Sequence, residues 1–88
     1  MTRPVNEIAA EIHVAMRDMP PAPWIPMARP FVDALLNVKS FKDFYGIDSA
    51  VYIGRMFLEN ALQWKGSQAI RIKAEIRQAI EEAEHANN

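Results

Sequence analysis

Hydrophobic positions recur along this chain mostly at three- and four-residue steps, the spacing of one face of an α-helix. From about residue 4 to 17, Val5, Ile8 and Ile12 begin such a stripe, and it continues to Ala15 and Met19. Pro4 suits the first turn, because its missing N–H has no intrahelical partner to lose there. The pattern predicts an N-terminal helix with one buried face.

The most regular stripe lies between about residues 67 and 85, after a break at Gly66 and a potential cap at Ser67. Its members are Ala69, Ile72, Ile76, Ala79, Ile80 and Ala83. The sequence therefore predicts a long last helix with one narrow apolar face.

A wider apolar stripe follows Asp48, a favourable N-cap, and reaches about Trp64. So wide a face is typical of the central helix of a bundle. Gly54 inside this helix costs about 1 kcal/mol relative to alanine. We therefore expect another helix to cross close to Gly54.

Four prolines fall within residues 20–26 at Pro20, Pro21, Pro23 and Pro26, with Trp24 among them. Each proline removes a backbone donor and pushes its predecessor toward extended geometry. The sequence predicts an extended proline-rich segment over residues 20–29. It would separate the N-terminal helix (1–19) from a helical body (30–86), whose first helix would begin near residue 30 and end near residue 39.

Residues 40–46 carry Ser40 and Asp43 at nearly the spacing of a capping box, followed by Gly46. This predicts one short helical turn with a left-handed stop at Gly46. A turn, a glycine and a capped helix also suggest helix-turn-helix geometry. Tyr52 and Arg55, however, occupy positions where that motif needs apolar packing.

The chain has 88 residues, 50% of them hydrophobic, with no cysteine and a formal net charge of -1. This length predicts one all-α domain, a bundle of about four helices with the short turn and the extended segment. So much apolar side chain on a short chain favours a homodimer. The charge offers no electrostatic attraction for nucleic acid or membranes. The lack of cysteine excludes thiolate sites and disulfides.

Thr2, Arg3 and Pro4 lead directly into the helical pattern, without the apolar run of a secretory signal. No apolar run approaches the length that spans a bilayer. We therefore expect a cytoplasmic protein.

Catalytic and metal motifs are sparse. Glu82 and His85 have the spacing used in di-iron bundles, but the pair occurs once. His13 has no acidic cluster beside it, and the sequence contains neither a phosphate-binding loop nor a nucleophile motif. The sequence predicts neither catalysis nor a bound metal or cofactor.

Two surfaces are candidates for protein contacts. One is the proline-rich segment, and the other is the outer face of the last two helices. The predicted contact residues are Trp24, Ile25, Met27, Tyr52, Arg55, Met56, Lys65, Arg71 and Arg77. In the alternatives, Trp24 packs over the core, helix 1–19 is exchanged between protomers, or the charges of the last helix face solvent. Lys65, Ser67 and Arg71 can also hold an anion at the last helix's start.

The stretch from Phe57 to Ala61, then Trp64 to Gly66 and Ala69 to Glu75, resembles the C-terminal part of small bacterial and phage proteins. The size and cysteine-free helical composition are similar to those of phage accessory proteins that bind and block host machinery, including anti-CRISPR proteins. The resemblance implies a non-catalytic module that binds a larger protein complex. The alternative is a small dimeric DNA-binding regulator with a helix-turn-helix around Gly46.

Overall fold

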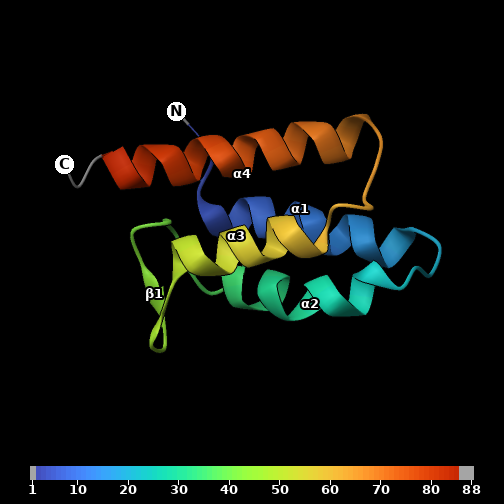
Figure 1. Cartoon of the computed structure of the whole chain (residues 1–88), viewed down its shortest axis with the longest axis horizontal. Helices are drawn as coiled ribbons and strands as arrows, with labels where there is room; N and C mark the ends of the chain where they lie inside the picture. The colour runs from blue at the N-terminus through green and yellow to red at the C-terminus, as the bar shows by residue number, and fades with distance from the viewer. Residues whose placement is uncertain (1, 86–88) are drawn as a thin grey trace.

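The computed structural model describes residues 2–85, in which four helices lie side by side and a small hairpin projects at one end (Figure 1). The helices are α1 (Val5–Asp18), α2 (Trp24–Leu35), α3 (Ala50–Asn60) and α4 (Ser67–His85), and the strands are β1 (Phe44–Tyr45) and β2 (Asp48–Ser49). Each successive helix runs back along the long axis, which measures 41 Å. The expected helical character is confirmed, with a hairpin that was not expected.

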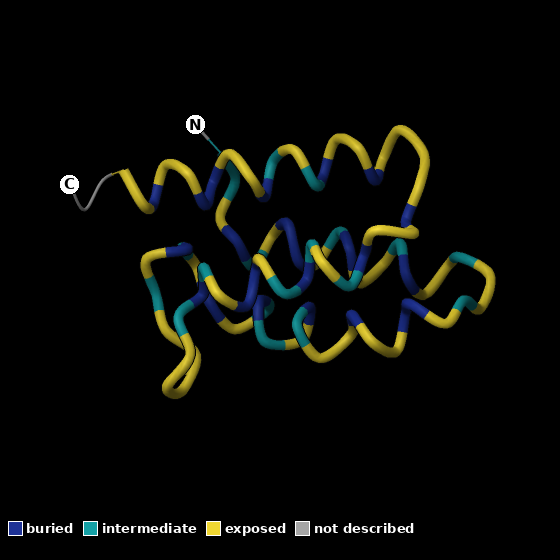
Figure 2. The backbone as a smooth tube through the Cα atoms, in the orientation of Figure 1, coloured by how far each residue is buried: buried dark blue, intermediate teal, exposed yellow. Residues whose placement is uncertain are grey.

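The core lies between the helices, where the dark segments of the tube in Figure 2 face one another. The whole predicted stripe of α4 is buried, so that prediction is confirmed. In α1, Val5, Ile8 and Ile12 are buried as expected, but Met16 is buried next rather than Ala15 or Met19. Those two side chains are half-buried at the edge of the core.

The extended segment predicted for residues 20–29 is not confirmed, because α2 already begins at Trp24 instead of Pro30. Pro26 is tolerated as the third residue of α2, since first-turn N–H groups have no intrahelical partner. Pro30 lies in the helix interior, where proline costs about 3 kcal/mol. Burial of Trp24 and Ile25 on the same helix offsets that cost. Only residues 19–23 connect α1 to α2, and residues 20–23 of this connection are called the proline turn.

The helical turn predicted for residues 40–46 was wrong, because this segment leads into an antiparallel hairpin. Phe44 pairs with Ser49 and Tyr45 pairs with Asp48. Gly46 has the expected positive φ of 65°, but it serves the hairpin turn rather than a helix end. A positive φ at the first central residue alone is the pattern of type II′ hairpin turns.

The predicted capping interaction nevertheless forms before the hairpin. The Asp43 carboxylate accepts hydrogen bonds from the backbone N–H groups of Lys39 (3.0 Å) and Ser40 (3.1 Å). The Asp43 carbonyl accepts from the N–H of Ala50 at 2.9 Å. These bonds fix the base of the hairpin to the start of α3.

The bounds of α3 differ from the prediction at both ends. Ser49 is the N-cap instead of Asp48, and its hydroxyl accepts from the N–H of Tyr52 at 3.1 Å. The helix ends at Asn60, before Trp64. A Cβ at Gly54 would lie 2.6 Å from Cε1 of Phe41 and 3.1 Å from Cδ1 of Ile80. The close neighbour is therefore chiefly a side chain of the connection before the hairpin, and α4 comes second to it instead of crossing alone as expected.

Three aromatic side chains close the core at the end that carries the proline turn. The Trp24 and Trp64 rings stack with centroids 6.0 Å apart, and Phe57 meets Trp64 edge-on at 6.4 Å. The ammonium of Lys73 donates to the Trp64 carbonyl at 2.7 Å. The proline turn thus brings Trp24 onto the connection between α3 and α4.

Candidate functional site

The hairpin carries three exposed apolar side chains, among them the most exposed large apolar side chain of the described residues. Ile47 at its tip is 96% exposed and Phe44 is 67% exposed, with Tyr45 also exposed beside them. Figure 2 shows the hairpin tip as an exposed loop that projects from the helices. Clustered exposed apolar side chains on a small protein are typical of an interaction site.

Each face of the hairpin carries one aromatic side chain. Phe44 and Tyr45 are successive residues of β1, so their side chains point to opposite faces. Ile47 follows at the tip between them and β2. We call residues 44–49 the finger. Its shape and chemistry are those of a wedge that can enter a groove between two apolar walls.

The base of the finger is anchored in the core. Phe41 is buried, and its ring lies against the backbone of α3 at Gly54. The Ser49 cap and the Asp43–Ala50 backbone bond hold the other side. The exposed side chains therefore stand on a fixed support, which lowers the entropy lost when they bind.

The contact residues predicted for the proline-rich segment differ in exposure, since two of them are buried and one is exposed. Trp24 and Ile25 are buried, so the alternative in which Trp24 packs over the core is the one observed. Met27 lies on the outer face of α2 and is exposed. Helix α1 packs against α2 and α4 of its own chain.

The contact residues predicted on α3 lie on or next to its outer face. Tyr52 is exposed in the first turn, directly after the finger. Arg55 donates to the Glu84 carboxylate of α4 at 2.6 Å, and Met56 is half-buried. Tyr52 is therefore the member of this set that continues the apolar surface of the finger.

The basic residues predicted at the start of α4 do not converge on one point. Lys65 and Ser67 are exposed, whereas the Arg71 guanidinium is bound to Glu11 of α1. Among the residues that the structure describes, no ion pair joins Arg77 to Glu81 four positions later. The expected anion site therefore lacks one of its cations, because Arg71 already has a carboxylate partner.

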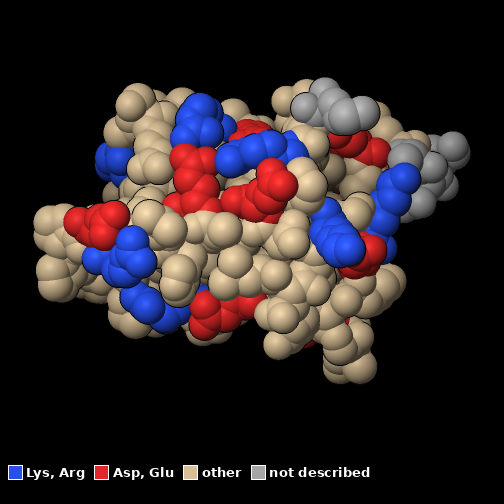
Figure 3. Space-filling model, turned by 180° about the vertical axis from the view of Figure 1, so that it is seen from behind, with Lys and Arg blue, Asp and Glu red and all other residues tan. Residues whose placement is uncertain are grey.

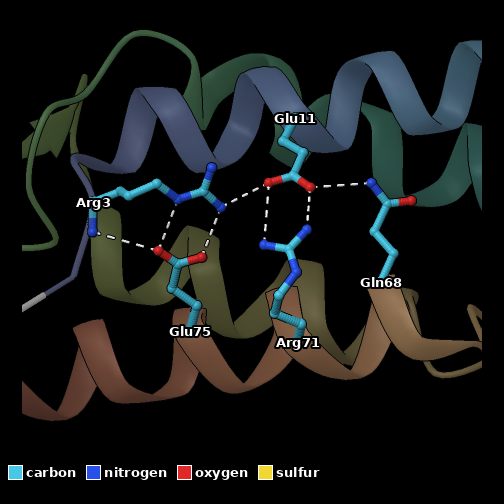
Figure 4. Close-up of polar contacts among 5 residues, drawn as sticks. All are labelled: Arg3, Glu11, Gln68, Arg71 and Glu75. Atoms are coloured by element: carbon cyan, nitrogen blue, oxygen red, sulfur yellow. Dashed lines mark hydrogen bonds and ion pairs between the residues drawn. The ribbon is translucent and has the colours of Figure 1, made fainter.

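A polar cluster joins the N-terminal segment to α1 and α4 (Figure 4). The Arg3 guanidinium holds Glu75 through two bonds, from Nε at 2.9 Å and from Nη2 at 2.7 Å. Arg3 also reaches Glu11 at 2.8 Å. Glu11 further accepts from Gln68 at 3.1 Å and from Arg71. Figure 3 shows this interleaving of acidic and basic side chains on the face where α1 and α4 meet.

These contacts shift the pKa values of both carboxylates. Hydrogen bonds from Arg71, Gln68 and Arg3 lower the pKa of Glu11 to about 2. The hydrogen bond from Arg3 lowers the pKa of Glu75. A carboxylate with so low a pKa is a weak proton acceptor near neutral pH. The chemistry of the cluster is therefore that of a clamp between segments, which the sequence pattern did not predict.

The residues considered for metal binding are not grouped as metal ligands. Glu82 accepts hydrogen bonds from Thr2 and Gln78. Within residues 2–85, no group of three or more His, Asp or Glu side chains is placed to hold a metal ion. Within that same range, no helix combines the length and apolar character needed to cross a membrane.

The helix-turn-helix geometry considered around Gly46 was wrong, because a hairpin occupies the place of the first helix. Helix α3, which would be the DNA-reading helix of such a motif, directly follows the finger. A signal for the hairpin was present in the sequence. Aromatic residues on one side of a Gly-Ile pair fit a two-residue hairpin loop as well as they fit a helix end.

No family model, curated protein or solved structure matches this chain. The resemblance of residues 57–75 to bacterial and phage proteins therefore depends on those residues alone. Any function has to be argued from the surface of the molecule.

Proposed function

We propose that this chain is a non-catalytic protein-binding module whose contact surface is the finger together with Tyr52. The observation that carries the proposal is the exposure of Phe44, Tyr45 and Ile47 on a hairpin with an anchored base. Aromatic and large aliphatic side chains dominate the energetically important centres of protein interfaces. Exposing them to water has no stabilising role in the folded chain, so a partner accounts for their presence.

The partner is a larger protein or protein complex with an apolar cleft. A projecting wedge inserts its side chains into a cleft, whereas a flat patch requires a flat partner. In functional class, we assign the chain to the phage or mobile-element accessory proteins that act in the bacterial cytoplasm. It blocks a host complex by occupying such a cleft, in analogy to the class of anti-CRISPR inhibitors that bind and block host machinery. The small size of the module suits occlusion rather than catalysis.

The test is affinity capture from nuclease-treated bacterial lysate, comparing the tagged protein with two variants that carry the same substitution. Ile47→Asp places a charge at the tip of the finger, and Ile70→Asp places one on α4. Ile70 is 70% exposed, which makes it a matched control. We expect the wild-type protein and Ile70→Asp to retain one stoichiometric protein, identified by mass spectrometry.

Ile47→Asp should reduce capture at least about 30-fold, since a side chain at the centre of an interface contributes about 2 kcal/mol or more. Equal capture by Ile47→Asp would remove the finger from the interface. Recovery of the bait alone would contradict the module itself. Retardation of duplex DNA at low salt would then point to DNA binding through a surface other than a helix-turn-helix.

A further inference from the structure

The end of the molecule opposite the finger contains an apolar groove with basic edges. It lies between the C-terminal part of α1, the proline turn and the start of α2, and it encloses about 790 Å³. Its floor includes Met16 and Ile25, both buried, and its walls include Met19 and Pro26. Such a volume is typical of sites that take up several side chains or a small ligand.

The charges of the groove and of the finger are opposite. The groove is lined by three basic side chains, His13, Arg17 and Arg29, and by no acidic residue. Arg17 is paired with Asp18 at 3.4 Å, outside the lining, whereas Arg29 is exposed. The finger carries one carboxylate, on Asp48, and no basic side chain. Asp48 is exposed opposite Tyr45 in the hairpin.

A single copy cannot join the two elements. Figure 1 shows the hairpin at one end of the long axis and the proline turn at the other end, and that axis measures 41 Å. The finger that enters the groove must therefore belong to a second copy of the chain.

We propose that the finger of one copy inserts into the groove between α1 and α2 of the next copy. Phe44 and Tyr45 face the two walls of the groove, Ile47 reaches the floor, and Asp48 lies beside Arg29. This inference rests on the finger as the contact element of the proposed function, and it specifies how the expected homo-oligomer forms.

The geometry of this contact restricts the kind of oligomer. Finger and groove are different surfaces, so each contact is head-to-tail, and such contacts either close into a ring or reciprocal pair or continue as an open chain. The form proposed is the open chain, in which each added copy leaves one finger and one groove open. One hairpin buries a small area, so each contact belongs to the weak class of interfaces, below about 1,200 Å².

A second groove of about 840 Å³ is a poorer acceptor for the finger. It adjoins the hairpin's own base at Phe41 and Lys42, and most of its lining residues are polar or charged. An apolar wedge would leave those groups without water or partners. The groove at the proline turn has neither disadvantage.

The experiment is sedimentation equilibrium of the pure protein from about 10 μM to 1 mM, a range suited to weak interfaces. We expect the average mass of the wild-type protein to rise continuously past that of a dimer. The finger variant is Ile47→Asp and the groove variant is Pro26→Asp. The latter places an acid in the groove, but in the first turn of α2, where the helix dipole favours it.

Each variant alone should stay monomeric, because one surface of every contact is damaged. An equimolar mixture should form one-to-one pairs and nothing larger, because only one intact finger and one intact groove meet. Ile70→Asp should associate like the wild type. Arg29→Glu should weaken association about tenfold, and Asp48→Lys in the same chain should restore it.

A wild-type mass that stays at the monomer or stops at the dimer would overturn the proposal. So would association of Ile47→Asp or of Pro26→Asp alone, or a mixture of the two that stays monomeric. Pro26→Asp leaves the finger intact, so it keeps the lysate partner while it loses self-association. Failure of head-to-tail assembly is thereby distinguished from failure of the proposed function.

Discussion

Two aromatic groups of this chain lie in opposite environments. Trp24, Phe57 and Trp64 stack and pack edge-on inside the bundle, whereas Phe44 and Tyr45 stand in water on the finger. Side chains of the same type thus hold the fold together in one region and leave apolar surface for a partner in the other. The two aromatic groups differ in exposure because helices surround the first group, whereas the second group stands beside a two-residue hairpin turn.

The largest expected effect is on the free energy of unfolding, which should fall when a buried aromatic residue is removed but not when an aromatic residue of the finger is removed. Phe57→Ala removes a fully buried ring and should lower the free energy of unfolding by about 3–5 kcal/mol. Phe44→Ala makes the same chemical change on the finger and should stay within about 0.5 kcal/mol. Urea unfolding of both variants measures the contrast. A loss above 2 kcal/mol for Phe44→Ala would mean that the finger contributes to the fold.

A smaller effect tests how the finger's base depends on the core. Gly54→Ala gains about 1 kcal/mol of helix propensity but places a Cβ 2.6 Å from the buried Phe41 ring. Overpacking costs about 1–3 kcal/mol, so a net loss of about 1 kcal/mol is expected. The double variant Gly54→Ala with Phe41→Leu should lose less unfolding free energy than the sum of the losses of the two single variants. The smaller side chain of leucine relieves the crowding at residue 54. Strict additivity in urea unfolding would contradict the contact.

The smallest effect concerns the polar cluster, which belongs to neither aromatic group. Glu11 has a pKa lowered from 4.5 to about 2 in the folded chain. A lowered folded-state pKa stabilises the protein above pH 4.5, and this contribution is lost as the pH falls toward 2. Glu11→Gln should therefore lower stability by about 1 kcal/mol at pH 6 and by much less at pH 2.5.

Urea midpoints at pH 6 and pH 2.5 measure this difference, with Glu59→Gln as a control on the exposed face of α3. Glu59→Gln should change the free energy of unfolding by no more than a few tenths of a kcal/mol at either pH. An equal effect of Glu11→Gln at both pH values would mean that the carboxylate charge contributes nothing, and that only its shape matters. Added salt should reduce the effect at pH 6.

The spacing of apolar residues was sufficient to predict the elements in which a single helix buries one face against the core. The α4 stripe and the start of α1 near Pro4 were both predicted, because each depends on spacing within a single helix. The α2 boundary was mispredicted because proline rules describe the isolated backbone. They do not include the free energy from burying Trp24, which tertiary packing supplies.

The candidate site was predicted less well than the fold. Tyr52 was expected on the surface and lies there, whereas Trp24 and Ile25 were expected as contacts and are buried. The finger was interpreted as helical because Gly46 can end a helix or turn a hairpin with the same positive φ. Cross-strand pairing distinguishes these outcomes, and pairing is not local to the glycine.

The sequence by itself determined that the chain is mainly helical, that α4 buries one face, and that Gly46 and Gly54 occupy constrained positions. These follow from side-chain periodicity and backbone sterics, which act within a few residues. Only the tertiary structure decided that Trp24 lies on Trp64, that Glu11 joins Arg3 to Arg71, and that the finger stands opposite the groove. Those arrangements join residues far apart in sequence, and their free energy exists only once the helices have packed.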